Sequence, residues 1–226
     1  MPAMPAPGPL PMRERYRAHV RHEVKQAALR QLEESGPAAV SISAIGKQLG
    51  MSGPALYRYF ASRNELLTEL TIDAYHDLAD ALGAAAGRAP DRGAHARLEE
   101  VGRAYRSWAL AQPHRYRLLY GPPLPGYDAH AQRLVEAAQA SMAVLIEVLR
   151  GPGDPAAVSP GPPLASQLSA WARKHSLEAD PATALRAVLA WSRLHGLVSL
   201  EIAGNFASMS IDPDQVFEVQ LATLTA

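Results

Sequence analysis

Residues 41–67 read SISAIGKQLGMSGPALYRYFASRNELL, and this stretch decides the fold. Its apolar spacing predicts a short helix over 43–49, which Ser41 or Ser43 can cap. Gly50 ends that helix, because glycine adopts the left-handed backbone at little cost. Ser52 can cap a second helix, whose first turn holds Pro54 at a position where proline loses no hydrogen bond. The stretch therefore predicts two short helices that meet at a tight corner.

Such a corner is typical of a helix-turn-helix, whose second helix brings its first residues to base edges in a groove about 12 Å wide. Small residues are needed where the backbone approaches DNA, and the second helix opens with Ser52, Gly53, Pro54 and Ala55. The tyrosine hydroxyls nearby suit phosphate oxygens, and basic side chains add affinity. These residues are Tyr57, Tyr59, Lys47, Arg58 and Arg63. Packing of either tyrosine against the first helix remains an alternative.

The apolar residues of the same stretch are spaced to form a small core. They are Ile45, Leu49, Met51, Leu56, Phe60 and Leu67. Such a core holds the two short helices at a fixed angle to the first.

This stretch resembles the N-terminal DNA-binding region of TetR-family transcriptional regulators. The shared pattern begins with an Ile-Ala pair, which is Ile45-Gly46 in this chain. It continues with a glycine, an apolar residue and a serine, and then with Leu-Tyr-x-x-Phe. A basic residue followed by apolar pairs ends it. The resemblance implies DNA contacts at Ser43, Lys47, Ser52, Gly53, Pro54, Ala55, Tyr57, Tyr59 and Arg63. One departure is the start Gly53-Pro54-Ala55, which offers few donors to bases. Base recognition then depends on backbone amides, Ser52, Arg58 and DNA shape.

The charge of the chain is unevenly distributed. The 226 residues have a formal net charge of zero, yet 13–63 carry nine Lys and Arg against four Glu, a net +5, which leaves −5 for the remainder. This asymmetry favours contact between a polyanion and the N-terminal part alone, although a solvated charged face is the alternative. The absence of cysteine excludes disulfides, thiolate zinc sites and cysteine nucleophiles, and fits a cytoplasmic protein.

The rest of the chain reads as helices separated by proline and glycine. We expect a disordered arm at 1–12, a three-helix helix-turn-helix DNA-binding domain at 13–61 and a larger helical ligand-binding and dimerisation domain at 62–226. The predicted helices, besides the short pair, are 13–34, 62–86, 94–111, 113–120, 128–150, 163–178, 181–205 and 212–225. The predicted fold class is all-α. No segment has about 18 uninterrupted apolar residues, so we predict no membrane span.

Residues 181–206 are apolar on nearly every face of a helix, which is typical of a buried element. Trp191, His195 and Gly196, together with Pro113 and Tyr116, resemble the regulatory domain of a TetR subgroup named for its Trp-His-Gly run. The resemblance implies a homodimer in which helices at about 181–205 and 212–225 form a four-helix bundle. Glycine costs about 1 kcal/mol inside a helix, so Gly196 predicts close approach of another helix.

A ligand pocket is expected among the aromatic residues of the larger domain. The candidates are Tyr105, Trp108, Tyr116, Tyr120, Met142, Trp171, Trp191 and His195. Ordinary core packing is the alternative for each aromatic residue, and His195 either donates to a ligand or satisfies a buried carbonyl. The Pro/Gly-rich stretches 121–127 and 151–163 are either gates to such a pocket or surface loops.

The sequence argues against catalysis and metal binding. His19 and His22 are three residues apart, where zinc proteases have four, and arginines surround them. No phosphate-binding glycine loop or nucleophile elbow occurs, so we predict no enzyme, no metal and no cofactor. The predicted function is a repressor that an unknown small molecule releases from a palindromic double-stranded DNA operator. The alternative is a helical small-molecule-binding or interaction protein without sequence-specific DNA recognition.

Overall fold

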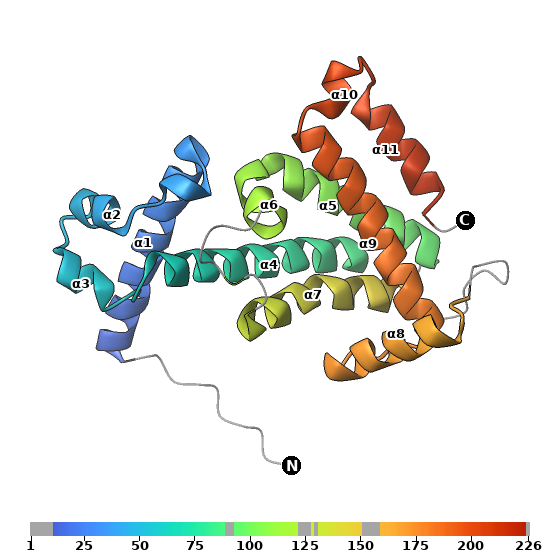
Figure 1. Cartoon of the computed structure of the whole chain (residues 1–226), viewed down its shortest axis with the longest axis horizontal. Coiled ribbons are helices and arrows are strands. Elements are labelled where there is room, and N and C mark those ends of the chain that lie inside the picture. The colour runs from blue at the N-terminus through green and yellow to red at the C-terminus, as the bar shows by residue number, and fades with distance from the viewer. Residues whose placement is uncertain (1–10, 89–92, 122–127, 129–130, 151–158, 225–226) are drawn as a thin grey trace, which may run out of the picture. The chain divides into compact units, whose positions relative to one another are not determined.

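The computed structural model describes residues 11–88, 93–121, 128, 131–150 and 159–224. These residues form helices and turns with no strand among them, which confirms the all-α prediction (Figure 1). The described residues fall into two compact units, the first reaching Leu70 and the second beginning at Thr71. The predicted boundary after residue 61 lies earlier, because the first two turns of α4 (Arg63–Gly87), with buried Leu66 and Leu67, belong to the first unit. The predicted arm lies outside the described residues as far as residue 10.

The first unit contains four elements before α4, of which only the first is long. They are α1 (Met12–Ser35), the 3-10 turn η1 (Pro37–Ala39), α2 (Ile42–Gln48) and α3 (Gly53–Tyr57). Gly50 has φ of +65°, as expected for the residue that ends α2. The Ser41 hydroxyl caps α2 by accepting the Ala44 amide at 3.3 Å, so Ser41 and not Ser43 is the cap.

The cap of α3 differs from the prediction. Ser52 holds the N-cap position, but its side chain makes no capping hydrogen bond to a described residue. The usual donors are not free: Pro54 has no N–H, and the Ala55 amide donates to the Ser52 carbonyl at 3.0 Å. The Ser52 hydroxyl is therefore not used within α3.

The core of the first unit fixes α2 and α3 against α1. Ile45, Leu56, Phe60 and Leu67 are fully buried as predicted, whereas Leu49 and Met51 are half-buried. Gly46 lies against the corner itself, since a Cβ there would be 3.2 Å from the Met51 carbonyl oxygen. At the start of α4, Ser62 Oγ accepts the Glu65 amide at 3.1 Å. The Glu65 carboxylate accepts the Ala61 amide, so only half of the predicted capping box forms.

The second unit consists of the rest of α4 and seven helices among the described residues. They are α5 (Ala94–Ala111), α6 (Pro113–Tyr120), α7 (Gln132–Leu149), α8 (Pro162–Lys174), α9 (Pro181–Ile202), α10 (Asn205–Ser208) and α11 (Pro213–Ala222). The predicted helices are confirmed, although α7 begins at Gln132 and not at 128, α8 ends at Lys174 and α9 ends at Ile202. Gly204 has φ of +79° and separates α10 from α9, a break that the prediction of one helix to 205 missed. Most of the stretches 121–127 and 151–163 lies outside the described residues.

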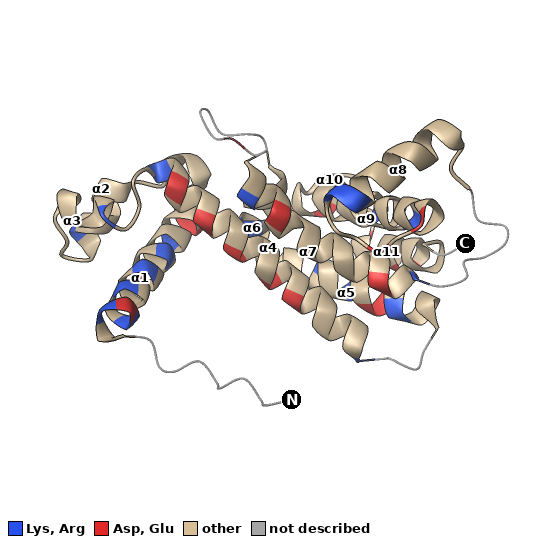
Figure 2. Cartoon of the chain, turned by 90° about the horizontal axis from the view of Figure 1, so that it is seen from below, with Lys and Arg blue, Asp and Glu red and all other residues tan. Residues whose placement is uncertain are grey.

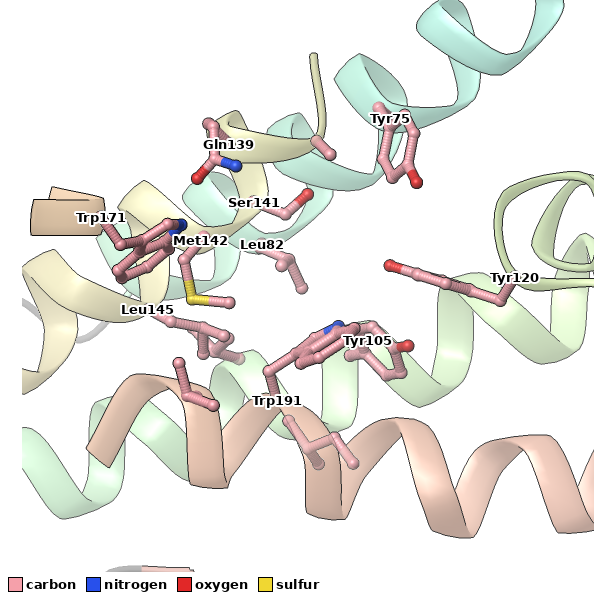
Figure 3. A pocket seen from close by; sticks show the side chains of 14 residues that line it. Tyr75, Leu82, Tyr105, Tyr120, Gln139, Ser141, Met142, Leu145, Trp171 and Trp191 are labelled. Atoms are coloured by element: carbon pink, nitrogen blue, oxygen red, sulfur yellow. The ribbon is translucent and has the colours of Figure 1, made fainter. Parts of the chain in front are cut away.

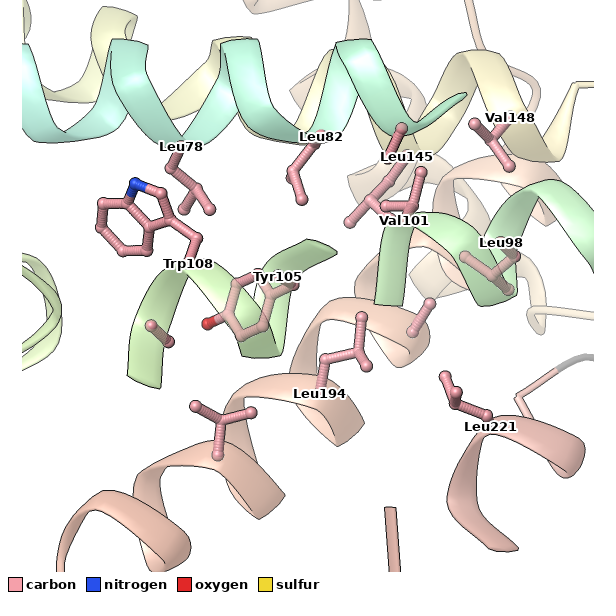
Figure 4. Packing of buried hydrophobic residues seen from close by; sticks show 14 of the residues in the cluster. Leu78, Leu82, Leu98, Val101, Tyr105, Trp108, Leu145, Val148, Leu194 and Leu221 are labelled. Carbon is pink, nitrogen blue, oxygen red and sulfur yellow. The ribbon is translucent and has the colours of Figure 1, made fainter. Parts of the chain in front are cut away.

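Helix α9 lies at the centre of the second unit and contacts α5, α7, α8, α10 and α11. Buried side chains from α4, α5, α7, α9 and α11 meet around it, as Figure 4 shows for Leu82, Tyr105 and Leu194. The described helices are too short or too polar to cross a lipid bilayer.

Within the described residues of one chain, no other helix approaches Gly196 closely. A Cβ at Gly196 would have no described atom within 4 Å outside its chain neighbours and its own helix backbone. A Cβ on Gly102 of α5 would instead lie 2.6 Å from Leu221 Cδ2 and 3.3 Å from Leu194 Cδ2. Gly102 therefore lets α5, α9 and α11 pack closely.

Candidate functional site

The corner between α2 and α3 presents its predicted DNA-contacting residues to solvent. Ser43, Lys47, Ser52, Gly53, Pro54, Tyr57 and Arg58 are exposed, and Ala55 and Tyr59 are half-buried. Tyr57 is 53% exposed, whereas its neighbour Leu56 is fully buried, which sets the inner and outer sides of α3. More than half of the surface of Tyr57 is therefore open to solvent.

Not every basic residue of the first unit faces solvent. Arg21 Nη2 lies 3.1 Å from Glu69 Oε2, and the Arg21 guanidinium lies 4.3 Å from the centroid of the Phe60 ring. Arg21 Nη1 also donates to the Tyr59 carbonyl oxygen, which ties the end of α3 to α1. Lys25 Nζ lies 3.3 Å from the same Glu69 carboxylate. Figure 2 shows further Lys and Arg on α1, α2 and α3, so positive charge remains around the corner.

Arg63 does not have the position expected of a DNA contact. Its Nε donates to the Val40 carbonyl oxygen at 2.9 Å, and its Nη2 donates to the Pro37 carbonyl oxygen. The half-buried guanidinium thus holds η1 and the start of α4 together. This geometry gives Arg63 a positioning role and does not support the predicted contact.

The second unit contains a largely apolar pocket of about 290 Å³. Five of the eight predicted residues line it, namely Tyr105, Tyr120, Met142, Trp171 and Trp191 (Figure 3). Nine further lining residues were not predicted, namely Tyr75, Leu82, Val101, Ala138, Gln139, Ser141, Leu145, Val188 and Leu194. Spacing on α7 carried a signal that was not used, since Ala138, Ser141, Met142 and Leu145 recur at three-to-four spacing.

The other three predicted residues do not line this pocket. Trp108 is buried, and its indole N–H donates to Asp77 Oδ2 at 3.0 Å. The buried Tyr116 hydroxyl lies 2.8 Å from His195 Nδ1, and the His195 ring stacks on Trp191 with centroids 5.8 Å apart. His195 thus supports the pocket wall from behind, and its ring nitrogen pairs with a tyrosine hydroxyl. Burial lowers the pKa of His195 below its usual value, which favours a neutral imidazole.

Three polar atoms in the pocket region are buried without a hydrogen-bond partner among the described residues. They are the Tyr105 hydroxyl, Gln139 Oε1 and Ser141 Oγ. Burial, with the nearby phenol groups of Tyr120 and Tyr116, raises the pKa of Tyr105 well above its usual value, and burial raises the pKa of Tyr120 to about 12. Both phenols are therefore neutral at physiological pH and able to donate a hydrogen bond.

Two family models match the chain. The model described as "Bacterial regulatory proteins, tetR family" matches residues 26–70, and the one described as "Tetracyclin repressor-like, C-terminal domain" matches 98–224. The chain belongs to the TetR family. This TetR-family chain is thus a DNA-binding transcriptional regulator of the helix-turn-helix type, with α2 and α3 inside the segment that the first model matches.

Relatives and solved structures agree with this assignment. The HTH-type transcriptional regulator Rv1816 of Mycobacterium tuberculosis is 33% identical over 217 residues, which cover 93% of this chain and 92% of the relative. A crystal structure of the proposed regulatory protein SCO4313 is 41% identical with a TM-score of 0.79, covering 95% of this chain and 98% of that one. The regulator FadR of Bacillus subtilis, solved with stearoyl-CoA, is 14% identical with a TM-score of 0.59 over 91% of this chain and 97% of its own. That last likeness concerns the fold alone.

Proposed function

We propose that this TetR-family chain is a repressor that a small molecule releases from a palindromic DNA operator. The observation that carries the proposal is the outward side of α3, where Tyr57 is 53% exposed while Leu56 is fully buried beneath it. A recognition helix needs one side held by a core and the other side free for the major groove.

The residues around the corner suit a division of tasks on DNA. Lys47 and Arg58 bring positive charge to phosphates, and Tyr57 brings a hydroxyl that can donate to a phosphate oxygen. Gly53 has no side chain and the ring of Pro54 is compact, so the backbone can approach the duplex closely. The Ser52 hydroxyl, which α3 does not use as a cap, is the first candidate for base contact.

A second copy of the chain is the proposed partner of α9 and α11. Leu189 and Leu200 on α9 are 42% and 45% exposed, and Val219 on α11 is 67% exposed. Gly196 lies between the two leucines at helical spacing and has room for a neighbouring helix. Burial of this apolar surface in a four-helix bundle would give a two-fold dimer, whose recognition helices read half-sites about 34–36 Å apart.

Helix α9 links the proposed effector site to the proposed dimer surface. Val188, Trp191 and Leu194 line the pocket, whereas Leu189 and Leu200 face solvent from the same helix. A ligand that binds one position of α9 more tightly than another would shift the protein toward that position, to an extent set by the difference in affinity. The separation of the recognition helices would change with it. We infer a Trp-His-Gly type of regulatory domain from the same helix, in which Trp191 stacks on His195 beside Gly196.

A gel-shift experiment with the promoter fragment beside the protein's own gene tests this proposal. Tyr57→Ala should weaken binding at least about tenfold, because it removes a phosphate donor and its supporting ring. Tyr57→Phe keeps the ring and should lose only part of the affinity, and an unrelated fragment should bind more weakly than the promoter. Equal binding of both fragments by the wild-type protein would favour the second function below.

The second candidate function is a binding or interaction protein that retains the fold without base-specific recognition. The start Gly53-Pro54-Ala55 favours it, because these three residues provide no side-chain hydrogen-bond donor. In that case a small molecule should bind the pocket, while any DNA binding should be independent of sequence.

A further inference from the structure

The pocket of the second unit contains buried polar groups that have no hydrogen-bond partner among the described residues. Tyr105 is 3% exposed and Ser141 is 9% exposed, yet neither hydroxyl has a hydrogen-bond partner among the described residues. A buried polar atom without a partner is costly, and most such atoms in folded proteins are paired with protein, water or ligand. The two hydroxyls therefore point to a molecule that enters the pocket.

Ser141 is the more informative of the two. A serine inside a helix commonly donates to the carbonyl four residues earlier, which would satisfy its hydroxyl locally. Ser141 makes no such bond, although it lies in the middle of α7. It lies on the same side of α7 as Met142 and Leu145, which line the pocket (Figure 3). Gln139 Oε1, also on α7, is a third buried atom without a described partner.

The walls of the pocket restrict the charge of its occupant. None of the described residues that line it is Lys, Arg, Asp, Glu or His. An ion buried there would lose its hydration without gaining an opposite charge, which is far more costly than burying a neutral hydrogen-bonding group. The part of the occupant that enters is therefore uncharged.

The same walls restrict its shape and size. Trp171, Trp191, Tyr75 and Tyr120 contribute aromatic rings from four helices, and Figure 3 shows the Tyr120 hydroxyl directed into the space between them. Aromatic walls favour flat partners, through stacked and edge-to-face contacts. The volume is about 290 Å³. An apolar cavity of about 150 Å³ holds one benzene, so this pocket suits about two rings.

We propose that the pocket binds an uncharged molecule of two aromatic rings that carries at least one hydroxyl group. The hydroxyl pairs with the orphaned atoms of Ser141 and Tyr105, because a hydroxyl both donates and accepts. The rings fill the space between Trp171 and Trp191. This inference rests on the proposed function in one respect, namely that this pocket is the effector site.

Calorimetry at pH 7 with three probes of the same ring size tests the inference without DNA. The probes are 2-naphthol, naphthalene and the anion 2-naphthoate, each used below its solubility limit. The wild-type protein should bind 2-naphthol about tenfold more tightly than naphthalene, which is the value of one satisfied buried hydrogen bond. It should bind 2-naphthoate at least tenfold more weakly than 2-naphthol, because the carboxylate finds no counter-charge.

Variants of the two orphaned hydroxyls make the test specific. Ser141→Ala and Tyr105→Phe should each reduce the preference for 2-naphthol over naphthalene, and the double variant should abolish it. Ser141→Ala should not lower the melting temperature of the ligand-free protein, because it removes a hydroxyl that has no partner among the described residues. Ser192→Ala, at an exposed serine of α9, is the matched control and should keep the wild-type preference.

Three results would overturn the inference: absence of 2-naphthol binding, equal or tighter binding of 2-naphthoate, or an unchanged preference in the double variant. A parallel gel shift keeps the proposed function separate. If 2-naphthol binds with the expected preference but does not release DNA, the proposed ligand class is supported. The proposal that an effector in this pocket releases DNA is then wrong. If an anionic probe binds and releases DNA, the proposed regulatory function is supported and the proposed class of uncharged ligands is wrong.

Discussion

Arg63 shows how a side chain of the expected type can have a different task. A basic residue after Leu-Tyr-x-x-Phe matches the position that implies a DNA contact, and residue type was all that the sequence offered. In the structure its guanidinium donates to the carbonyl oxygens of Val40 and Pro37. Those partners are distant in sequence, so local pattern could not predict them.

Arg63→Ala should lower the free energy of unfolding by about 1–3 kcal/mol, because two carbonyl oxygens lose a charged donor. Arg58→Ala, at an exposed arginine of the neighbouring α3, is the matched control. It should change stability by less than about 0.5 kcal/mol while weakening DNA binding. Urea unfolding followed by circular dichroism measures both. An Arg63→Ala protein with unchanged stability and lost DNA binding would indicate that Arg63 contacts DNA and does not have this positioning role.

His195 should make stability depend on pH. Burial lowers its pKa in the folded protein, so in the unfolded chain this histidine binds a proton at a higher pH. Its contribution is present above the unfolded pKa of about 6.5 and is lost as pH falls from there toward the lowered folded value. His195→Gln should therefore show a smaller loss of melting temperature between about pH 7.5 and pH 5.5. His19→Gln, at an exposed histidine of α1, should keep the wild-type loss.

At the scale of elements, the local sequence predicted where most helices lie better than it predicted which side of each helix faces the pocket. Gly50 and Pro54 require particular backbone conformations, so the corner between α2 and α3 was readable from residues a few positions apart. Gly204 gave a similar signal that was overlooked, and the end of α9 was misplaced as a result. Periodicity separates buried from exposed sides of a helix, but it could not decide which of the buried aromatic side chains face the pocket and which pack in the core. Trp108 and Tyr116 belong instead to the core.

The glycines of α5 and α9 give a matched pair of variants. Gly102→Leu should destabilise the protein by about 1–3 kcal/mol, because Leu221 and Leu194 already occupy the space around it. A Cβ at Gly196 has no described atom within 4 Å outside its chain neighbours and its own helix backbone, so the fold should tolerate Gly196→Leu, but this change should convert the proposed dimer to a monomer. Thermal unfolding and light scattering measure these effects. A wild-type monomer at micromolar concentration, or a Gly196→Leu dimer, would contradict the proposed use of α9.

At the scale of the whole molecule, the two units differ in what they offer a partner. The first unit has an exposed corner with basic residues, and the second has a pocket with buried polar atoms that lack a partner among the described residues. The sequence predicted this division from charge, since 13–63 carry a net +5 and the remainder −5. It could not predict the pocket polarity, because an unpaired Ser141 is a property of packing and not of residue type.

The salt dependence of DNA affinity tests the central claim that the α2–α3 corner contacts the duplex. Each phosphate contact adds about 0.9 to the slope of log affinity against log salt concentration. Lys47→Ala, at an exposed lysine of α2, should reduce that slope by about one unit on every DNA sequence. Lys174→Ala, at an exposed lysine of α8, makes the same charge change and should leave the slope unaltered. Equal slopes for Lys47→Ala and the wild-type protein would contradict the claim.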